Sequence, residues 1–324
     1  MKKYRWGFVG SGGISHRAVR DIAQLERAEV YAIASRQQAS ADVFAQKYGL
    51  KKAYADFEML CKDPQVDIIY IGTPHIYHKE QTLLALSHGK AVLCEKPLSV
   101  SVRDTQAMIQ EAKIRKVFFM EALWTRFLPV MQQVKGWIHA GEIGEVISAK
   151  ASFCSKAKFD SESRIFFKKL GGGALLDLGV YPVSVLCYLL AGPIKKISAR
   201  GSIGTTQVDE EAEIILEFDS GAVATAACSI IRSAGESLTL EGTLGTVEVP
   251  FFWRATEAFL FCDNQLVKEA HGKESFEFEA LEVMKALDEG RLESPVMPWN
   301  ESLRVAQILE ESRCQVESPP RENF

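Results

Sequence analysis

Cysteines are few in this chain of 324 residues, and no two of them stand close together. An odd, dispersed set argues against a disulfide framework and lacks the paired spacing of a zinc site. We therefore expect reduced thiols in the core of a cytoplasmic protein. The seven are Cys61, Cys94, Cys154, Cys187, Cys228, Cys262 and Cys314.

The chain also lacks a surplus of basic residues. It carries 38 lysines and arginines against 42 aspartates and glutamates, which gives a net charge of −4. Because nucleic-acid binding depends on cations that neutralise phosphates, we do not expect nucleic acid as a partner.

No long hydrophobic run is free of polar or helix-breaking residues. The most apolar stretch, residues 174–191, contains Asp177, Gly179 and Pro182. It therefore predicts a buried helix rather than a membrane span, and we expect no membrane partner. Residues 1–7 lead directly into an apolar strand and lack the apolar segment of a secretory signal.

The composition that remains is that of a globular protein, with 47% hydrophobic and 25% charged residues, and the length suggests two domains. Up to residue 122, strand-like and helix-like patterns alternate. Strands are expected at 4–9, 29–35, 66–71, 91–94 and 117–121, and helices at 14–25, 39–48, 79–88 and 102–115. This alternation is typical of an α/β domain with a doubly wound parallel sheet, which we assign to residues 1–122.

The rhythm changes in the rest of the chain, residues 123–324. Helices are expected at 129–140, 174–190, 276–289 and 301–313, and strands at 145–153, 194–204, 211–218, 223–230, 238–240 and 247–249. Asp219-Ser220-Gly221 predicts a hairpin turn. We predict an α+β domain with an open, mostly antiparallel sheet, and a frayed tail at 317–324. The open sheet face needs a cover, so a homodimer formed through this sheet is expected.

A glycine-rich turn follows the first predicted strand and opens the first predicted helix. Gly10 permits a tight turn, and Gly12 and Gly13 let backbone N–H groups approach a pyrophosphate at the helix start, near Ile14. Ser15 is small enough for the helix to pack on the strand. In this context the turn predicts a dinucleotide site in a Rossmann domain; the alternative is a loop that only turns the chain.

The end of the second strand distinguishes NAD from NADP. An acidic residue at this position binds the ribose hydroxyls of NAD. This chain has Ser35 and Arg36 instead, a hydroxyl and a guanidinium that suit a 2′-phosphate. NADP is therefore the expected cofactor, unless Arg36 is merely a solvated surface residue.

Two further motifs end strands of the parallel sheet, at the edge where ligands bind in such folds. Thr73-Pro74-His75 follows the strand expected at 66–71, and Cys94-Glu95-Lys96-Pro97 ends the strand expected at 91–94. Lys96 can donate to a substrate oxygen and lower the pKa of a neighbouring acid, although a lone lysine is more often a surface ammonium. His75 and His78 have metal-like spacing but no third ligand nearby, so they are expected on the cofactor side or as helix caps.

Taken together, these motifs and the glycine-rich segment 171–182 resemble the Gfo/Idh/MocA oxidoreductase family over nearly the whole chain. The segments 90–97, 120–127 and 293–298 resemble, within it, the dimeric dihydrodiol and NADP-dependent D-xylose dehydrogenases. The resemblance implies cofactor contacts by Gly10, Gly12, Gly13, Ile14, Ser35, Arg36, Thr73, Pro74, His75, His78, Glu95 and Lys96. It also implies a Rossmann domain followed by a substrate-binding and oligomerisation domain.

Asp177 and Tyr181 stand four residues apart and would share one face of a helix. Many family members have histidine where this chain has Tyr181. A free tyrosine with a pKa near 10 is a poor base, but a nearby ammonium lowers that pKa. We predict Tyr181 as general acid/base, assisted by Lys96, with Asp177 orienting Lys96 or holding a substrate hydroxyl. The alternatives are a core tyrosine and a carboxylate that stabilises the helix N-terminus.

Four aromatic residues could wall the substrate pocket, although packing in the core is the commoner role of any one of them. The expected function is hydride transfer between NADP and a hydroxyl-bearing carbon of a sugar or cyclic diol. The rivals are a sugar ketone or aldehyde reductase of the same fold, a non-catalytic NADP-sensing regulator and a redox-assisted glycoside hydrolase. The aromatic residues are Trp124, Phe153, Trp253 and Phe278.

Overall fold

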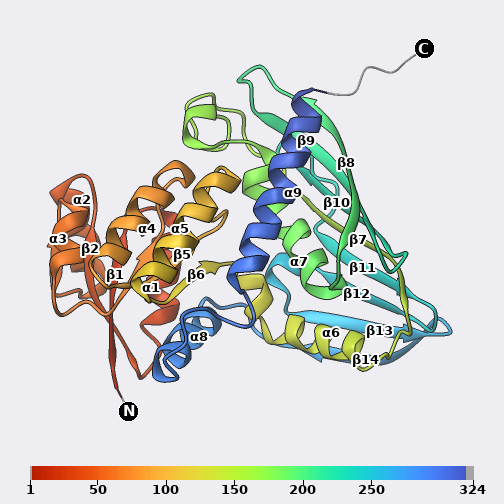
Figure 1. Ribbon diagram of the computed structural model, residues 1–324, viewed down its shortest axis with the longest axis horizontal. Helices are drawn as coiled ribbons and strands as arrows, with labels where there is room; N and C mark the ends of the chain where they lie inside the picture. Colours follow the sequence, from red (N-terminus) through yellow and green to blue (C-terminus); the bar gives the residue numbers. More distant parts are fainter. Residues whose placement is uncertain (1, 319–324) are drawn as a thin grey trace. The chain divides into compact units, whose positions relative to one another are not determined.

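The computed structural model describes residues 2–318 (Figure 1). Within this range the internal contacts divide the chain into two compact units. The first unit runs to Trp124 and also takes in Ser275–Leu303, while the second comprises Thr125–Glu274 and the chain from Arg304 onward. The expected domains, 1–122 and 123–324, differ from these units chiefly in the placing of Ser275–Leu303.

The first unit contains a parallel sheet, which within residues 2–318 has six strands in the order β3-β2-β1-β4-β5-β6. All of its neighbouring strands are parallel, which confirms the doubly wound Rossmann-like fold. The order reverses between β1 and β4, where ligands bind in open α/β sheets. The strands are β1 (Tyr4–Val9), β2 (Ala28–Ala34), β3 (Lys52–Tyr54), β4 (Ile68–Ile71), β5 (Ala91–Glu95) and β6 (Phe119–Ala122).

These strands are apolar because helices cover both faces of the sheet. Every residue of β4 and β5 is buried, as expected where helices cover both faces of a parallel sheet. The short elements β3 and α3 were not predicted, because three strand residues and six helix residues are too few for a period to show. The helices are α1 (Gly13–Ile22), α2 (Gln38–Tyr48), α3 (Phe57–Lys62), η1 (His75–Tyr77), α4 (His78–Ser87), α5 (Val102–Arg115) and α8 (Glu277–Asp288).

Helix α8 belongs to the first unit although 150 residues of the second unit, Thr125–Glu274, precede it. It packs on α1, and the backbone N–H of Phe276 donates to Asp21 at 2.9 Å. Farther along the same segment, the indole N–H of Trp299 donates to the carbonyl of Phe119 at 2.9 Å. These long-range bonds tie Ser275–Leu303 to helix α1 and to strand β6 of the parallel sheet.

The second unit is built on a sheet that has eight strands among the described residues, in the order β14-β13-β12-β11-β7-β10-β9-β8. Within the described part of this second sheet, only β7 and β10 pair in parallel, so the expected mostly antiparallel sheet is confirmed. The strands are β7 (Val146–Cys154), β8 (Ile194–Ile203), β9 (Asp209–Phe218), β10 (Val223–Ser229), β11 (Ser237–Gly242), β12 (Thr246–Pro250), β13 (Glu257–Cys262) and β14 (Gln265–His271).

The hairpin between β9 and β10 forms at the expected turn, where Gly221 has φ +92° and its N–H donates to the carbonyl of Phe218 at 3.0 Å. Strands β13 and β14 were not predicted. β14 is exposed along almost its whole length, so its residues do not alternate between apolar and polar. The remaining elements are η2 (Trp124–Phe127), α6 (Pro129–His139), η3 (Lys168–Leu170), η4 (Leu175–Gly179), α7 (Val180–Leu190), η5 (Phe252–Arg254) and α9 (Trp299–Glu317).

The expected buried helix after residue 174 is confirmed, but it begins as a π-helical segment, η4, before continuing as α7. The stretch Lys168–Leu190 is long and apolar enough to cross a membrane, and 89% of its most apolar window is buried inside the protein. It thus packs as a core helix, in contact with β7 and β10. Of the predicted frayed tail, Glu317 ends α9, and residues 319–324 lie outside the described part of the chain.

Candidate active site

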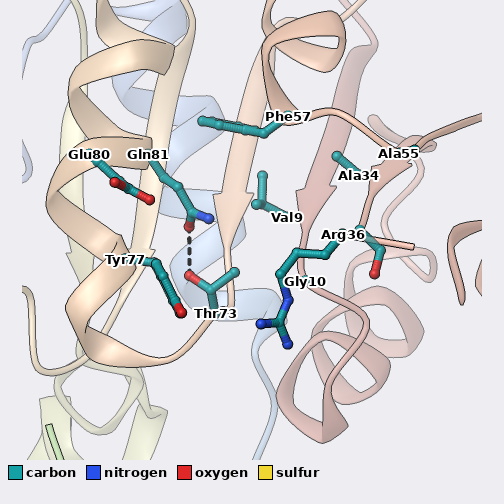
Figure 2. A pocket seen from close by; sticks show the side chains of 11 residues that line it. Val9, Gly10, Ala34, Arg36, Ala55, Phe57, Thr73, Tyr77, Glu80 and Gln81 are labelled. Atoms are coloured by element: carbon teal, nitrogen blue, oxygen red, sulfur yellow. Dashed lines mark hydrogen bonds between the residues drawn. The ribbon is translucent and has the colours of Figure 1, made fainter. Parts of the chain in front are cut away.

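A cavity of about 160 Å³ lies at the carboxyl end of the parallel sheet, where the strand order reverses (Figure 2). Gly10, Ser35, Arg36 and Thr73, all predicted to contact the cofactor, line it together. The other lining residues were not predicted, although Tyr77 and Gln81 stand at helical spacing after the threonine motif. The complete lining is Val9, Gly10, Ala34, Ser35, Arg36, Ala55, Phe57, Thr73, Tyr77, Glu80 and Gln81.

The glycine turn forms one wall of this cavity. Gly10 has φ +91°, and a Cβ there would lie 3.0 Å from the carbonyl oxygen of Gly72, so a side chain is excluded. A Cβ on Gly12 or Gly13 would meet nothing within 4 Å, which leaves open space before the start of α1. No side chain in the described range caps that start, so its N–H groups are available to an anion.

Close packing of α1 on the sheet depends on two small residues. Ser15 is fully buried, and a Cβ on Gly72 would lie 2.6 Å from its hydroxyl oxygen. A larger residue at either position would push the helix away from β4. The expected packing role of Ser15 is therefore confirmed.

Arg36 lies at the end of β2 and extends toward Gly10 in Figure 2. The hydroxyl of the neighbouring Ser35 lies 3.2 Å from that of Ser11 in the glycine turn. A guanidinium and hydroxyl groups therefore gather beside the open helix start. Glu80 places a carboxylate on the cavity wall, so the site contains both signs of charge.

Two backbone segments at this edge are tied together by His78, which is fully buried. Its Nδ1 lies 3.0 Å from the carbonyl oxygen of Pro97, and its Nε2 lies 2.8 Å from that of Thr73. Burial lowers the pKa of His78, against the effect of the surrounding carbonyl groups. The ring thus links the end of β4 to the end of β5; a direct cofactor contact by His78 stays a prediction.

In the described part of the chain, no three histidine, cysteine, aspartate or glutamate side chains are grouped closely enough to bind a metal ion. His75, the other histidine of the motif, is buried, and its ring centre lies 5.8 Å from that of His78. The seven cysteines are free thiols, five of them buried.

Lys96 follows directly after β5, and its backbone is fixed by its neighbour. The carboxylate of Glu95 accepts from the Tyr70 hydroxyl at 2.5 Å and from the backbone N–H of Lys96 at 3.2 Å. Both Glu95 and Tyr70 are buried, so they hold the end of β5 rather than face solvent. Lys96 itself is half-buried at the carboxyl end of the sheet, and its contact with a ligand stays a prediction.

In the second unit, Tyr181 lies in a cluster of aromatic rings. Its ring centre is 5.5 Å from that of Phe153 and 6.0 Å from that of Trp253, and it meets the indole edge-on. Phe153 and Trp253 stack at 4.8 Å with an interplanar angle of 14°. Three of the predicted site residues, far apart in the sequence, therefore meet at one place.

Asp177, one turn before Tyr181, accepts a hydrogen bond from Nη1 of Arg164 at 2.9 Å. Arg164 was not predicted, since it lies in the loop between β7 and η3. Its approach depends on the glycine segment: a Cβ on Gly172 would lie 2.8 Å from the carbonyl oxygen of Arg164 and 2.5 Å from that of Ile165. The three successive glycines were the sequence signal of this close backbone contact.

Asp209 anchors the start of the helix that carries Asp177 and Tyr181. Its Oδ2 accepts from the backbone N–H of Leu175 at 2.6 Å, and a Cβ on Gly173 would lie 2.3 Å from its Oδ1. Burial raises the pKa of Asp209 from 3.8 to about 6, partly offset by the bond from Leu175. The carboxylate thus holds the helix start in place at a cost in desolvation.

This cost predicts a pH effect on stability. Because the pKa of Asp209 is higher in the folded chain, about 6 against 3.8, the folded state binds its proton more tightly. The free energy of unfolding should therefore fall by about 3 kcal/mol from this group as the pH rises from about 3 to about 7, and stay level above. Thermal unfolding of Asp209→Asn across this range should lack the decline. Parallel curves for the variant and the wild type would contradict the assignment.

Trp124 and Phe278, the other two predicted pocket aromatics, belong to the first unit. The indole of Trp124 is buried and stacks on Phe276 at 4.8 Å, with the guanidinium of Arg17 4.5 Å from its ring centre. Phe278 is half-buried on α8. Substrate contact by either residue stays a prediction.

Known proteins resemble the chain along most of its length. The family described as "Oxidoreductase family, NAD-binding Rossmann fold" (GFO/IDH/MocA) matches residues 4–123, and the GFO/IDH/MocA C-terminal domain matches residues 131–248. The trans-1,2-dihydrobenzene-1,2-diol dehydrogenase of Bos taurus is 36% identical over 322 residues, covering 95% of this chain and 96% of the relative. The human protein of that name is 35% identical over 330 residues, with the same coverage.

Among solved structures, the 3-ketoreductase KijD10 of Actinomadura kijaniata, in complex with TDP-benzene and NADP, superimposes with a TM-score of 0.85. It is 24% identical, and the match covers 98% of both chains. At this identity the likeness extends to the fold alone.

Proposed function

Because this chain belongs to the Gfo/Idh/MocA oxidoreductase family, we propose that it is an NADP-dependent dehydrogenase acting on a hydroxyl-bearing carbon of a cyclic diol or a sugar. The observation that carries this proposal is the cavity lined by Gly10, in the glycine turn that leads into α1, and by Arg36. It combines the two groups that a dinucleotide with an extra phosphate requires.

The residues present fit NADP. Open space beyond Gly12 and Gly13 admits a pyrophosphate, whose charge is favoured by the helix N-terminus. Arg36, with Ser35 beside it, offers donors to a 2′-phosphate, and no acidic side chain stands at that position to accept ribose hydroxyls. When bound, the nicotinamide supplies the acceptor or donor of the hydride.

A cyclic diol is the first substrate class to consider, because the relatives at 34–36% identity carry the name of a dihydrobenzene-diol dehydrogenase. Aromatic rings beside Tyr181 suit the apolar face of such a ring or of a sugar. The reaction on a sugar ketone or aldehyde is the same hydride transfer in the opposite direction.

Proton transfer is assigned to Tyr181, whose phenol would take a proton from the substrate hydroxyl as the hydride leaves. The ammonium of Lys96 would favour the phenolate and donate to the same substrate oxygen. Asp177 is oriented by its hydrogen bond from Arg164. Of its two predicted roles, we therefore favour accepting a hydrogen bond from a second substrate hydroxyl over orienting Lys96. A diol or sugar has such a second hydroxyl adjacent to the reacting carbon.

Turnover assays test the proposal directly. The protein should oxidise a trans-dihydrodiol or an aldose with NADP⁺, and reduce the matching ketone or lactone with NADPH. NAD⁺ should support a much lower kcat/KM. If NADP binds but no member of a panel of diols, aldoses and keto-sugars reacts, the chain is a cofactor-sensing regulator instead. A cofactor that stays bound through dialysis would favour the redox-assisted hydrolase.

A homodimer is also proposed, formed through the open face of the eight-stranded sheet. Ile215 of β9 and Val223 of β10 are 37% and 42% exposed, so apolar side chains lie on an uncovered part of this sheet. Sedimentation equilibrium should give twice the chain mass of 36.0 kDa. Ile215→Glu should shift the protein toward the monomer; a wild type that sediments as a monomer would contradict the proposal.

A further inference from the structure

The indole of Trp253 is held by a side chain from another loop. Its Nε1–H donates to Oε2 of Glu236 at 2.8 Å, a bond strengthened by the charge of the carboxylate. Glu236 and Trp253 are each half-buried, so the bond lies at the border between the protein interior and solvent.

The backbone of Trp253 is fixed independently. Its carbonyl accepts from the hydroxyl of Thr125 at 2.7 Å, and the adjacent Phe252 is fully buried. The preceding Phe251 has φ +45°, which turns the chain sharply after β12. With the backbone held in this way, the indole can move chiefly by rotation of the side chain, and the bond to Glu236 restricts this rotation together with the stack on Phe153.

The loop that carries Glu236 also reaches the other half of the aromatic stack. The carbonyl of Gly235 accepts from the N–H of Cys154 at 3.1 Å, and the N–H of Ala234 donates to the carbonyl of Cys154 at 3.4 Å. Cys154 directly follows Phe153 on β7. One short loop therefore holds both partners of the Phe153–Trp253 stack, against which Tyr181 packs.

We propose that Glu236 is a positioning residue that fixes the indole of Trp253 beside Tyr181 and thereby sets the affinity for substrates with an apolar ring face. The inference rests on the proposed function of Tyr181 and deepens it by assigning a specificity determinant. A carboxylate is suited to this role because it accepts the indole N–H strongly without donating to the ring's neighbours. A substrate that has no ring should depend little on it.

Kinetic measurements on Glu236→Ala and Glu236→Gln test the proposal. The alanine variant should raise the KM for a cyclic diol about tenfold, with kcat changed by less than about twofold. The glutamine variant keeps an acceptor oxygen and should restore most of the affinity. In a Trp253→Phe background, removal of Glu236 should have no further effect, because phenylalanine has no N–H to position.

A readout without turnover separates this proposal from the proposed function. The fluorescence of Trp253 is isolated in each background as the difference between the protein with Trp253 and the same protein carrying Trp253→Phe. Acrylamide should quench this fluorescence more strongly in Glu236→Ala than in the wild type, and not more strongly in Glu236→Gln. If quenching rises but no substrate reacts, the positioning holds and the proposed function fails. Unchanged quenching together with an unchanged KM in Glu236→Ala would overturn the proposal, as would an equal loss in the Trp253→Phe background.

Discussion

Replacing Tyr181 with phenylalanine should lower kcat by about 10²–10⁴-fold, because the variant loses the group assigned to move the substrate proton. The ring is retained, so its contacts with Phe153 and Trp253 should persist. Affinity for NADPH, measured by fluorescence titration, should stay within about twofold, since Tyr181 does not line the nucleotide cavity. Loss of turnover without loss of cofactor binding would identify a residue of the chemical step.

Tyr188→Phe provides the matched control, because Tyr188 lies on the same helix and its hydroxyl bonds to Gln132 at 2.7 Å. This variant should lose some stability and keep kcat. If Tyr181→Phe retains its turnover, Tyr181 is a packing residue and the assignment of the general acid/base is wrong.

Replacing Arg36 with alanine should weaken NADP binding by about 10–100-fold while leaving NAD binding nearly unchanged. The reason is that a hydrogen bond to a charged group contributes about 1.5–3 kcal/mol, and only NADP has the 2′-phosphate that Arg36 would meet. Isothermal titration with both cofactors measures the two affinities. The preference should also decline as salt is raised, because the phosphate at the cavity mouth is partly screened.

Arg20→Ala is a suitable control for this experiment, since Arg20 is an exposed residue on α1 that does not line the cavity. Its removal should leave both affinities unchanged. An equal loss of NADP and NAD affinity in Arg36→Ala would show that Arg36 supports the cavity in general rather than the extra phosphate.

Most strands and helices of the parallel-sheet domain could be predicted, because the sequence patterns that indicate them lie within each element. Strand β1 and helix α5 have the bounds that the sequence predicts, and α5 is capped by the preceding Ser101, whose hydroxyl accepts from the N–H of Asp104. An apolar run that ends at a glycine and a capped amphipathic helix can both be recognised in a short window of sequence.

Features that depend on distant partners could not be predicted. Helix α8 was predicted as a helix, yet its return to the first unit follows from bonds to Asp21 and from packing on α1, which no local pattern records. Strand β14 is almost wholly exposed and owes its conformation to pairing with β13. Pairing of this kind is not encoded in periodicity.

The candidate site shows the same division. The glycine turn and Arg36 could be predicted because the dinucleotide fold places them at fixed positions along the chain. Arg164 and Glu236 could not, because each acts on a residue brought close only by the tertiary fold, Asp177 and Trp253 respectively. Motifs identified the residues proposed for the chemistry, whereas the groups that orient them required the structure.

Isotope transfer from the nicotinamide follows the proposed hydride itself. The protein is incubated with NADPH that carries deuterium at C4 of the nicotinamide, once for each face, and with the ketone or lactone form of each candidate substrate. We expect one of the two labelled cofactors to deliver its deuterium to the carbon that becomes the hydroxyl-bearing carbon of the product. Tight binding of NADPH with no deuterium in any product would contradict this expectation.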